Sequence, residues 1–313
     1  MPAAANVVPA LVAVVGPTAA GKSDLAVALA RRLGGEIVNA DSMQLYRGMD
    51  VGTAKLTVAQ RRGVPHHLLD VLDVTETAMV AAFQRRARAV VEGCAARGVA
   101  AVLVGGSALY VRAVLDRFAF PGTDPTLRAD LEGELASVGP AALHRRLAGI
   151  DPAAAAAILP SNGRRVVRAL EVVALTGRPY AASLPVHEYA YDPTVVRTVQ
   201  VGVAVPADLL CQRIERRVEA MWAAGLVDEV RRLEAAGLRA ERTASRALGY
   251  AEVLRHLAGE GTEEQAREQT VRATRRFARR QDRWFRGDPR IAWLPHDADD
   301  LVDRALAIVG EAR

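Results

Sequence analysis

The chain has 313 residues, 50% of them hydrophobic, and a formal net charge of +5. This length and apolar content can build one large or two modest domains with a buried core, which excludes a disordered chain. No apolar run reaches the roughly eighteen residues of a membrane span, and the N-terminus lacks the basic flank and cleavage site of a signal peptide. We therefore expect a cytoplasmic protein with no membrane partner, and the basic excess favours an anionic partner.

The first predicted element is a buried strand over residues 9–15, an apolar run. It leads into Gly16-Pro-Thr-Ala-Ala-Gly-Lys22-Ser23, which opens a helical pattern over residues 24–33. In such a loop the backbone N–H groups surround a phosphate, the lysine adds positive charge and the serine hydroxyl can ligate Mg²⁺. We predict phosphate binding by Gly16, Thr18, Ala19, Ala20, Gly21, Lys22 and Ser23, with Ser23 as the Mg²⁺ ligand. Whether the phosphates belong to a nucleotide such as ATP stays open.

A second strand is predicted over residues 36–40, and Asp41 follows it directly. Ligands of parallel α/β sheets bind beyond the carboxyl ends of the strands, so Asp41 should stand near the phosphate loop. A carboxylate there can help to order Mg²⁺ or accept a proton from a nucleophile, and the alternative is a turn or helix cap. Lys55 is placed at the same crevice, with a solvated surface lysine as the alternative.

Two adjacent histidines, His66 and His67, follow a proline. Neighbouring residues on an extended segment point to opposite faces, so we expect a structural role rather than joint metal ligation. Cys94 and Cys211 belong to no paired motif. They predict neither a disulfide framework nor a zinc site, and both are expected to be buried small residues.

A third strand, over residues 100–104, runs into Gly105-Gly106-Ser107. A nucleoside triphosphatase would place a metal-binding carboxylate at this point, so the glycines weaken an ATPase interpretation. After residue 118 many prolines and glycines punctuate short helical segments, and the next strand begins only at Arg197. We predict an α/β fold, with a P-loop core whose mostly parallel sheet is flanked by helices, plus a helical insertion and a helical C-terminal region. The predicted divisions are 1–118, 119–193 and 194–313, in a monomer.

The last long helix is predicted to begin at a capping box formed by Thr262 and Gln265. It carries arginines at three- to four-residue steps, with Trp284 and Phe285 near its end and only Asp282 to neutralise them within the helix. A stripe of this kind favours an extended polyanion such as nucleic acid over a plain solvated face. The arginines are Arg272, Arg275, Arg276, Arg279, Arg280, Arg283 and Arg286.

Nearly end to end, the chain resembles the bacterial tRNA dimethylallyltransferases, also called tRNA isopentenyltransferases. Several blocks in the right order carry the resemblance, and they are far more specific than the phosphate loop alone. The blocks are Gly16–Ser23, Asp41–Lys55, Pro65–Asp70, Gly105–Tyr110, Asn162–Glu171, Ala247–Tyr250 and Arg279–Arg286.

The resemblance implies transfer of a dimethylallyl group from dimethylallyl diphosphate to N6 of adenosine 37 in tRNAs that read codons beginning with U. Mg²⁺ would be the cofactor, Asp41 would remove the proton from the adenine amine, and Ser107 would help to place the adenosine. Arg213 and Arg217 would lie near the diphosphate. The implied tRNA contacts are Asp41, Ser42, Met43, Gln44, Ser107, Arg128, Arg164, Arg165, Arg168, Ala247, Leu248, Gly249, Tyr250, Arg279, Arg280, Gln281, Arg283, Trp284 and Arg286.

The chain departs from the family pattern at a few positions. Ser107 and Ala108 stand where Thr and usually Gly occur, and the first change keeps a hydroxyl group. Ala207 stands where an arginine is common, which removes a charge near the implied donor site. Asp282 and Arg283 replace an uncharged pair, so contacts in that block are approximate.

Three other interpretations stay open at this stage. A small-molecule kinase would use Asp41 to activate a substrate hydroxyl toward ATP, but it leaves the basic helix unexplained. A prenyltransferase that acts on free adenine nucleotides needs no RNA-binding surface. A non-catalytic RNA-binding protein would make Asp41 dispensable.

Overall fold

The computed structural model describes residues 10–180, 187–239 and 243–311. The chain forms two compact units. The larger unit comprises Met1–Asp116 together with Tyr189–Arg313, and the smaller one comprises Arg117–Glu188. The sequence placed the insertion at 119–193, so both limits of the smaller unit fall a few residues earlier than predicted.

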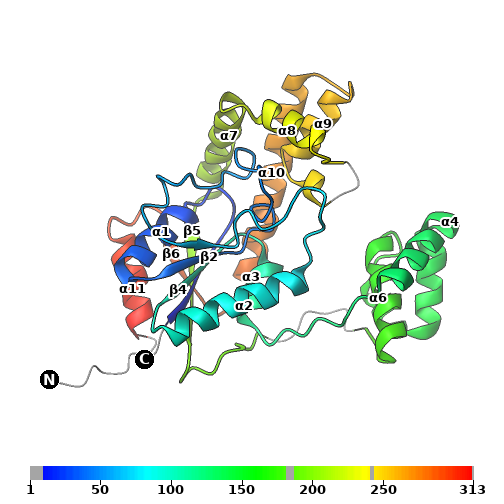
Figure 1. Cartoon of the computed structure of the whole chain (residues 1–313), viewed down its shortest axis with the longest axis horizontal. Coiled ribbons are helices and arrows are strands. Elements are labelled where there is room, and N and C mark those ends of the chain that lie inside the picture. The colour runs from blue at the N-terminus through cyan, green and yellow to red at the C-terminus, as the bar shows by residue number, and fades with distance from the viewer. Residues whose placement is uncertain (1–9, 181–186, 240–242, 312–313) are drawn as a thin grey trace. The chain divides into compact units, whose positions relative to one another are not determined.

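A six-stranded sheet in the order β3-β2-β4-β1-β5-β6 forms the centre of the larger unit (Figure 1). Every pairing between these strands is parallel, so their carboxyl ends meet at one edge. The order brings β2, β4 and β1 side by side, and the segments that follow these three strands become neighbours. The strands are β1 (Ala10–Val15), β2 (Glu36–Asn39), β3 (His66–His67), β4 (Ala101–Val104), β5 (Arg197–Ala204) and β6 (Ile291–Pro295).

Helices connect the strands and continue after β5 (Figure 1). In the larger unit they are α1 (Lys22–Leu33), α2 (Val80–Ala96), α3 (Ala108–Leu115), α7 (Ala207–Ala223), α8 (Leu226–Ala235), the 3₁₀ turn η1 (Ala244–Arg246), α9 (Tyr250–Leu257), α10 (Glu263–Arg286) and α11 (Leu301–Glu311). The α/β fold with a mostly parallel sheet is therefore confirmed.

Strand β1 shows why the sheet is covered on both faces. All six of its side chains are buried, as expected for an apolar run without alternation. The odd-numbered side chains join a cluster with residues of α2 and α3, and the even-numbered ones join α1 and α11. This double burial fixes β1, and with it the start of the phosphate loop, at the centre of the larger unit.

Two strands escaped the sequence analysis. β3 has only two residues and pairs with β2 through His66 and His67. β6 pairs with β5 and lies in the C-terminal region, which was expected to be almost wholly helical. Both are short edge strands, and two histidines or a run of five apolar residues form too short a pattern to distinguish a strand.

The smaller unit contains α4 (Pro125–Ile150), α5 (Pro152–Ala157) and α6 (Gly163–Thr176). The chain kinks within α4 at Gly139, whose φ of 78° no helix allows, and Pro140 follows. Leucines of α4, alanines of α5, and valines and a leucine of α6 form the core of this unit. α6 is followed by Gly177, which adopts the left-handed conformation of a helix C-cap.

Candidate active site at the carboxyl edge of the sheet

The glycine-rich loop connects the central strand to an uncapped helix. Gly16 and Gly21 have φ values of 137° and 95°, which strongly favour glycine, and Ala19 also has a positive φ of 64°. Gly21 is the N-cap residue of α1 and offers no side chain to cap it. The first N–H groups of α1 and the positive end of its dipole are thus available to an anion.

Lys22 lies half-buried at the start of α1, and its Nζ donates to the carbonyl of Pro17 at 2.6 Å. Burial, and next the charge of Arg217, lower the pKa of Lys22 from 10.5 to about 7, while the charge of Asp41 acts in the opposite direction. The ammonium therefore loses its proton easily in the free protein. A bound anion would favour the charged form and restore it.

Asp41 is held in a tight turn after β2. The amide of Asn39 accepts from the Asp41 N–H at 2.9 Å and donates to the carbonyls of Asp41 and Leu68, each at 3.0 Å. The Asp41 Oδ1 accepts from the N–H of Met43 at 2.9 Å. The turn-capping alternative is therefore confirmed for Oδ1, and Oδ2 supplies the further acceptor that a general base needs.

The loops after β2, β4 and β1 pack directly against one another. A Cβ on Gly105 would lie 2.7 Å from the carbonyl carbon of Ala40, which precedes Asp41. A Cβ on Gly106 would lie 3.5 Å from the carbonyl oxygen of Gly16. Glycine is thus required at Gly105 by close approach of the backbone, and Gly106 lies in contact with the phosphate loop. The structure brings the Asp41 turn and the phosphate loop to the two sides of this one segment.

Ser107 follows these glycines as the N-cap residue of α3, and its hydroxyl makes no capping hydrogen bond. It is half-buried at the same edge of the sheet. The hydroxyl is therefore available to a ligand, as its predicted role requires.

Two arginines of α7 were placed near the donor, and the structure distinguishes them. Arg217 donates to the carbonyl of Thr53 at 3.2 Å, and burial lowers its pKa while Asp41 opposes this. Arg213 instead faces the end of β6, where its Nη2 lies 3.0 Å from Nδ1 of His296. Of this pair, Arg217 is the arginine whose charge lowers the pKa of Lys22 and whose own pKa the charge of Asp41 raises.

The segment between Asp41 and Lys55 is fixed internally. Ser42, Met43 and Gln44 are half-buried, and Gln44 donates to the Thr53 carbonyl at 3.2 Å. The solvated-surface alternative for Lys55 is wrong. Its buried Nζ binds the carbonyl of Tyr46 at 2.9 Å and the carboxylates of Asp50 and Asp70 at 2.7 and 2.5 Å, so its three donors hold the loop together.

A buried carboxylate that sequence reasoning missed, Glu229 of α8, also holds this segment. It accepts from the N–H groups of residues 50, 51 and 52 at 2.8–3.1 Å. It also accepts from the hydroxyl of Tyr250 at 2.5 Å. Nothing in the local sequence around Glu229 indicates this role, because its partners lie far away in the chain.

The block 247–250 was predicted to contact tRNA, and the structure contradicts this for most of it. Ala247 and Tyr250 are 5% and 0% exposed, and Gly249 is buried as well. The Tyr250 ring packs so close to Gly52 that a Cβ there would overlap it. These three residues shape the interior, and only Leu248 is half-exposed.

Helix α10 has a buried face and a basic face. The arginines at 276, 279, 280 and 283 are exposed and share one side of the helix by their spacing. Among the described residues these four have no acidic partner within ion-pair distance, whereas Arg272, Arg275 and Arg286 pair with Glu268, Glu215 and Asp282. Within α10 itself, acidic side chains pair with two of the seven arginines, in agreement with the expected shortage of intrahelical neutralisation.

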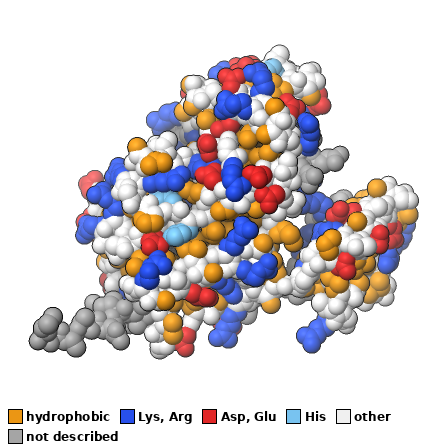
Figure 2. Space-filling model, in the orientation of Figure 1, with side chains coloured by type: hydrophobic (Ala, Val, Ile, Leu, Met, Phe, Trp, Pro, Cys, Tyr) orange, Lys and Arg blue, Asp and Glu red, His pale blue; other side chains and the backbone are white. Residues whose placement is uncertain are grey.

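The aromatic end of α10 contributes in two ways. Phe285 is buried in the core, while Trp284 is 39% exposed with the Arg112 guanidinium 6.0 Å from its ring centre. On the face shown in Figure 2, basic side chains lie among acidic ones over α8 and α9.

Gln281 was predicted to contact tRNA, but it is only 6% exposed and belongs to the inner face of α10. It follows Ala266, Thr270, Thr274 and Ala278, which are all buried, in a series with steps of three to four residues. That spacing was visible in the sequence and could have placed this residue inside.

In the smaller unit, two predicted tRNA contacts are bound internally. Arg128 and Arg168 both pair with the fully buried carboxylate of Glu171. Arg168 also donates to the carbonyls of residues 121 and 122 at 2.7 and 3.0 Å. Arg164 and Arg165 are exposed, so a tRNA contact fits them better than Arg128 or Arg168.

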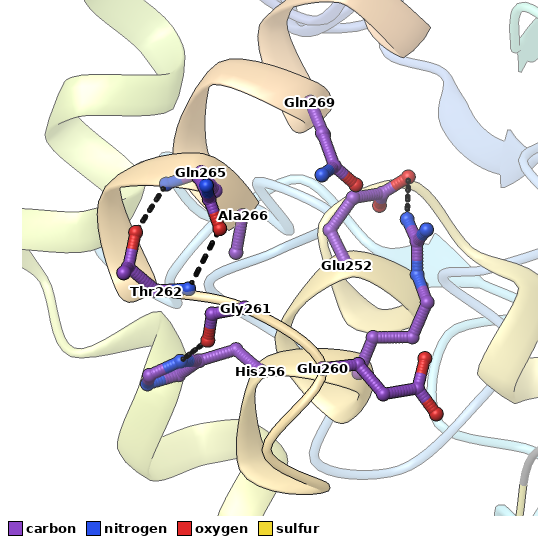
Figure 3. A pocket seen from close by; sticks show the side chains of 9 residues that line it. Glu252, His256, Glu260, Gly261, Thr262, Gln265, Ala266 and Gln269 are labelled. Atoms are coloured by element: carbon purple, nitrogen blue, oxygen red, sulfur yellow. Dashed lines mark hydrogen bonds and ion pairs between the residues drawn. The ribbon is translucent and has the colours of Figure 1, made fainter.

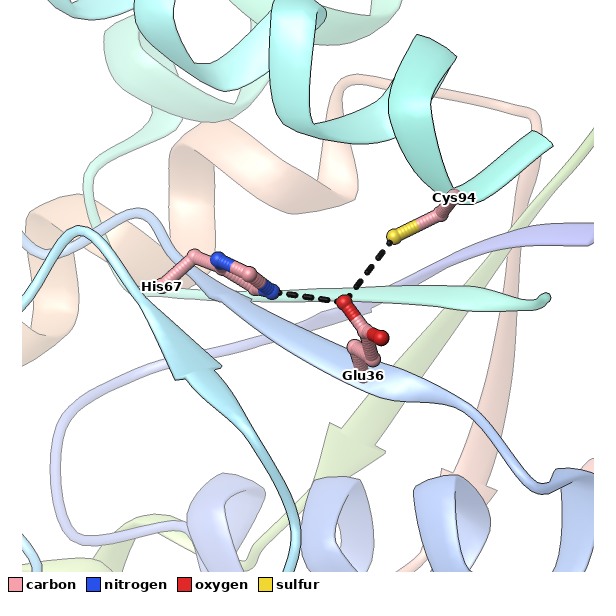
Figure 4. A group of neighbouring side chains, drawn as sticks. All are labelled: Glu36, His67 and Cys94. Carbon is pink, nitrogen blue, oxygen red and sulfur yellow. Dashed lines mark hydrogen bonds and ion pairs between the residues drawn. The ribbon is translucent and has the colours of Figure 1, made fainter. Parts of the chain in front are cut away.

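A group of potential metal ligands lies beside the edge strand β3 (Figure 4). Nε2 of His67 and Sγ of Cys94 lie 2.7 and 3.4 Å from the same oxygen of Glu36. Burial and the adjacent carboxylate raise the pKa of the Cys94 thiol to about 11, and Arg97 binds the other oxygen of Glu36 at 2.7 Å. A protonated thiol and a nearby guanidinium disfavour the binding of a metal cation. The contacts of Glu36 with His67 and Cys94 instead tie α2 to the sheet, in keeping with the structural role expected for the histidines.

A shallow depression between α9 and α10 is likewise structural (Figure 3). Its volume of about 10 Å³ is hardly enough for one water molecule. It is lined by the predicted capping box, in which Thr262 and Gln265 exchange hydrogen bonds of 2.9 and 3.2 Å.

No helix in the described part of the chain is long and apolar enough to cross a membrane.

This geometry defines a class: a parallel α/β protein with a glycine-rich loop between its central strand and an uncapped helix, and with a carboxylate after β2, which β4 separates from that central strand. The model of the IPP transferase family matches residues 44–288. The tRNA dimethylallyltransferase of Thermobifida fusca is 65% identical over 306 residues, which cover 96% of this chain and 94% of that protein. The enzyme of the same name from Streptomyces coelicolor is 63% identical over 304 residues, with 96% of each chain covered.

Solved structures agree with these relatives. The tRNA isopentenylpyrophosphate transferase of Bacillus halodurans has 42% identity and a TM-score of 0.71, with 97% of this chain and 96% of that chain covered. A eukaryotic dimethylallyltransferase acting on tRNA shares the fold at a TM-score of 0.80 and 24% identity, over 97% of this chain and 79% of that one. The chain belongs to the tRNA dimethylallyltransferase family and is a prenyl-transferring enzyme.

Proposed function

We propose that this chain transfers the dimethylallyl group of dimethylallyl diphosphate to N6 of adenosine 37 in tRNAs that read codons beginning with U, with release of diphosphate. Family membership supports the reaction class. The main structural support is the packing of the Gly105–Ser107 segment between the Asp41 turn and the phosphate loop. A leaving group and a proton acceptor then share one site.

On the donor side, the allylic carbon–oxygen bond breaks and diphosphate leaves with the bonding electrons. Lys22 and the uncapped start of α1 would neutralise the charge that develops on the leaving oxygen. The Arg217 guanidinium, already coupled electrostatically to Lys22, would add a second positive charge. Binding the donor would offset the repulsion between these two cations, which the free protein holds close together.

Mg²⁺ is part of this proposal, with Ser23 as its protein ligand. The donor set fits, because the Ser23 hydroxyl beside the loop and the diphosphate oxygens are the hard ligands that Mg²⁺ prefers. When bound, the ion would stabilise the negative charge of the leaving group. Ser23 would then orient the diphosphate relative to Lys22.

On the acceptor side, the adenine amine is a weak nucleophile because its lone pair is delocalised into the ring. Asp41 would accept a proton from N6 as the new carbon–nitrogen bond forms, and Ser107 would hydrogen-bond the base. The base must leave the anticodon stack to reach this site, so we propose base flipping. The exposed arginines of α10 would bind the phosphates of the tRNA.

The test is transfer of radiolabel from dimethylallyl diphosphate, with Mg²⁺, to an unmodified anticodon stem-loop. A stem-loop with guanosine at the target position and free AMP serve as controls. Label on the adenosine stem-loop alone supports the proposal, and label on AMP points to a nucleotide prenyltransferase instead. If neither acceptor is labelled and ATP-dependent phosphoryl transfer is found, the proposal is refuted. The monomeric state and the cytoplasmic location stay predictions.

A further inference from the structure

Gln281 connects two loops of the site through its side-chain amide. Its Oε1 accepts from the backbone N–H of Thr18 in the phosphate loop at 2.9 Å. Its Nε2 donates to the carbonyl of Gly106 at 2.7 Å. One side chain from α10 thus binds the loop after β1 and the loop after β4, directly before Ser107.

The amide packs closely against the segment after β4. A Cβ at Gly106 would lie 2.3 Å from the Gln281 Nε2, so a side chain at this position would displace the amide from its hydrogen bonds. The residue is 6% exposed, and losing either partner would leave a buried polar group unsatisfied. Among side chains of this length, only an amide offers one acceptor and one donor at neutral pH without a charge.

We propose that Gln281 is a positioning residue for the transfer reaction: it sets the phosphate loop against the segment that carries Ser107, and so sets the distance between donor and acceptor. This inference rests on the proposed function. Reacting atoms must approach to about 3–3.5 Å, and a displacement of about 1 Å can cost roughly 100-fold in rate. A residue that fixes two loops to each other acts on that distance without touching either substrate.

The position of Gln281 on α10 adds a connection to the acceptor. Arg279, Arg280 and Arg283 stand on the outer face of the same helical turn. A movement of this turn upon tRNA binding would pass through the Gln281 amide to Thr18. The same residue therefore couples the basic face to the phosphate loop.

The test compares Gln281→Met, which keeps the volume and removes both hydrogen bonds, with Gln281→Glu. The matched control is Gln269→Met, half-buried on the same helix about three turns earlier. We expect kcat of Gln281→Met to fall roughly 10- to 100-fold. The dissociation constant for the stem-loop should stay close to that of the control, whereas the melting temperature should fall because two backbone groups lose their partner.

Gln281→Glu adds a signature that a purely structural role would lack. Ionised, the new side chain cannot donate to the Gly106 carbonyl; protonated, it has one donor and one acceptor, as the amide does. The ratio of wild-type to Gln281→Glu kcat should shrink as pH falls from 8 to 5.5, while the ratio for Gln281→Met stays constant.

If Gln281→Met keeps the kcat of the wild type, the inference is overturned. It is also overturned if the loss of kcat parallels the fall in melting temperature and the kcat of Gln281→Glu does not recover at low pH. Binding of inorganic diphosphate with Mg²⁺, measured by calorimetry, should weaken in Gln281→Met. If the wild type transfers no label, the proposed function fails, and this binding measurement still tests whether Gln281 fixes the phosphate loop.

Discussion

Replacing Asp41 by asparagine separates its two roles. The substituted side chain keeps an Oδ1 that can accept from the N–H of Met43, so the turn after β2 should survive. It loses the ability to accept a proton from the adenine amine. Loss of a general base costs about 10²- to 10⁴-fold in kcat, equivalent to ~3–5 kcal/mol of transition-state stabilisation.

The substitution also has an electrostatic side effect whose sign the structure gives. The charge of Asp41 raises the pKa of Lys22, so its removal should lower that pKa further below about 7. At pH 8 the Lys22 ammonium would then be scarcer, and KM for the donor should rise. At pH 6 this effect should shrink because Lys22 is protonated again, whereas the loss in kcat should remain.

The assay is steady-state transfer to the stem-loop at pH 6 and pH 8, together with thermal unfolding. Asp41→Ala serves as the comparison, because it removes both the base and the turn and should lose about 0.5–1.5 kcal/mol of stability as well. If Asp41→Asn keeps kcat within about threefold of wild type at both pH values, Asp41 is a turn residue only. The reasoning about the base would then be refuted.

Three further outcomes are expected. Because the pKa of Lys22 is about 7, affinity for diphosphate should fall as pH rises from 6 to 8. Lys22→Met should lack the part of this fall that comes from the lysine. If calorimetry gives the same slope of affinity against pH for both proteins, the prediction is contradicted. Joint replacement of Arg279, Arg280 and Arg283 by alanine should weaken tRNA binding and flatten its salt dependence, and an unchanged slope of log Kd against log salt would exclude them as phosphate contacts. Tyr250→Phe should cost about 1.5–3 kcal/mol through the lost bond to a carboxylate, seen as a lower melting temperature, whereas an unchanged melting temperature would show that this bond adds nothing.

The sequence predicted the parts of the fold that have a local cause. Apolar runs identified β1, β2, β4 and β5, and the glycines at 16 and 21 identified the phosphate loop by the backbone conformations they permit. The edge strands β3 and β6 were missed because their existence depends on a neighbouring strand rather than on their own residues. Pairing partners are set by the tertiary fold, which no short window contains.

The predicted site residues divide in the same way. Lys22 and Asp41 follow strands, and the parallel sheet brings them together at its edge. The block around Tyr250 resembles the family as strongly as they do, but resemblance does not tell an interior residue from a surface one. Lys55 was misjudged for a similar reason, since its carboxylate partners at 50 and 70 meet only in the folded chain.

The larger unit has a second set of backbone N–H groups that binds an anion, and here the anion is the carboxylate of Glu229, a part of the chain itself. Three consecutive backbone N–H groups at 50–52 converge on it as those of a phosphate loop converge on a ligand. The carboxylate comes from a helix 178 residues beyond Val51. A fragment that ends before α8 would keep the glycine-rich loop and lose the counter-ion that shapes the backbone beside it, so the catalytic apparatus cannot be excised as an N-terminal module.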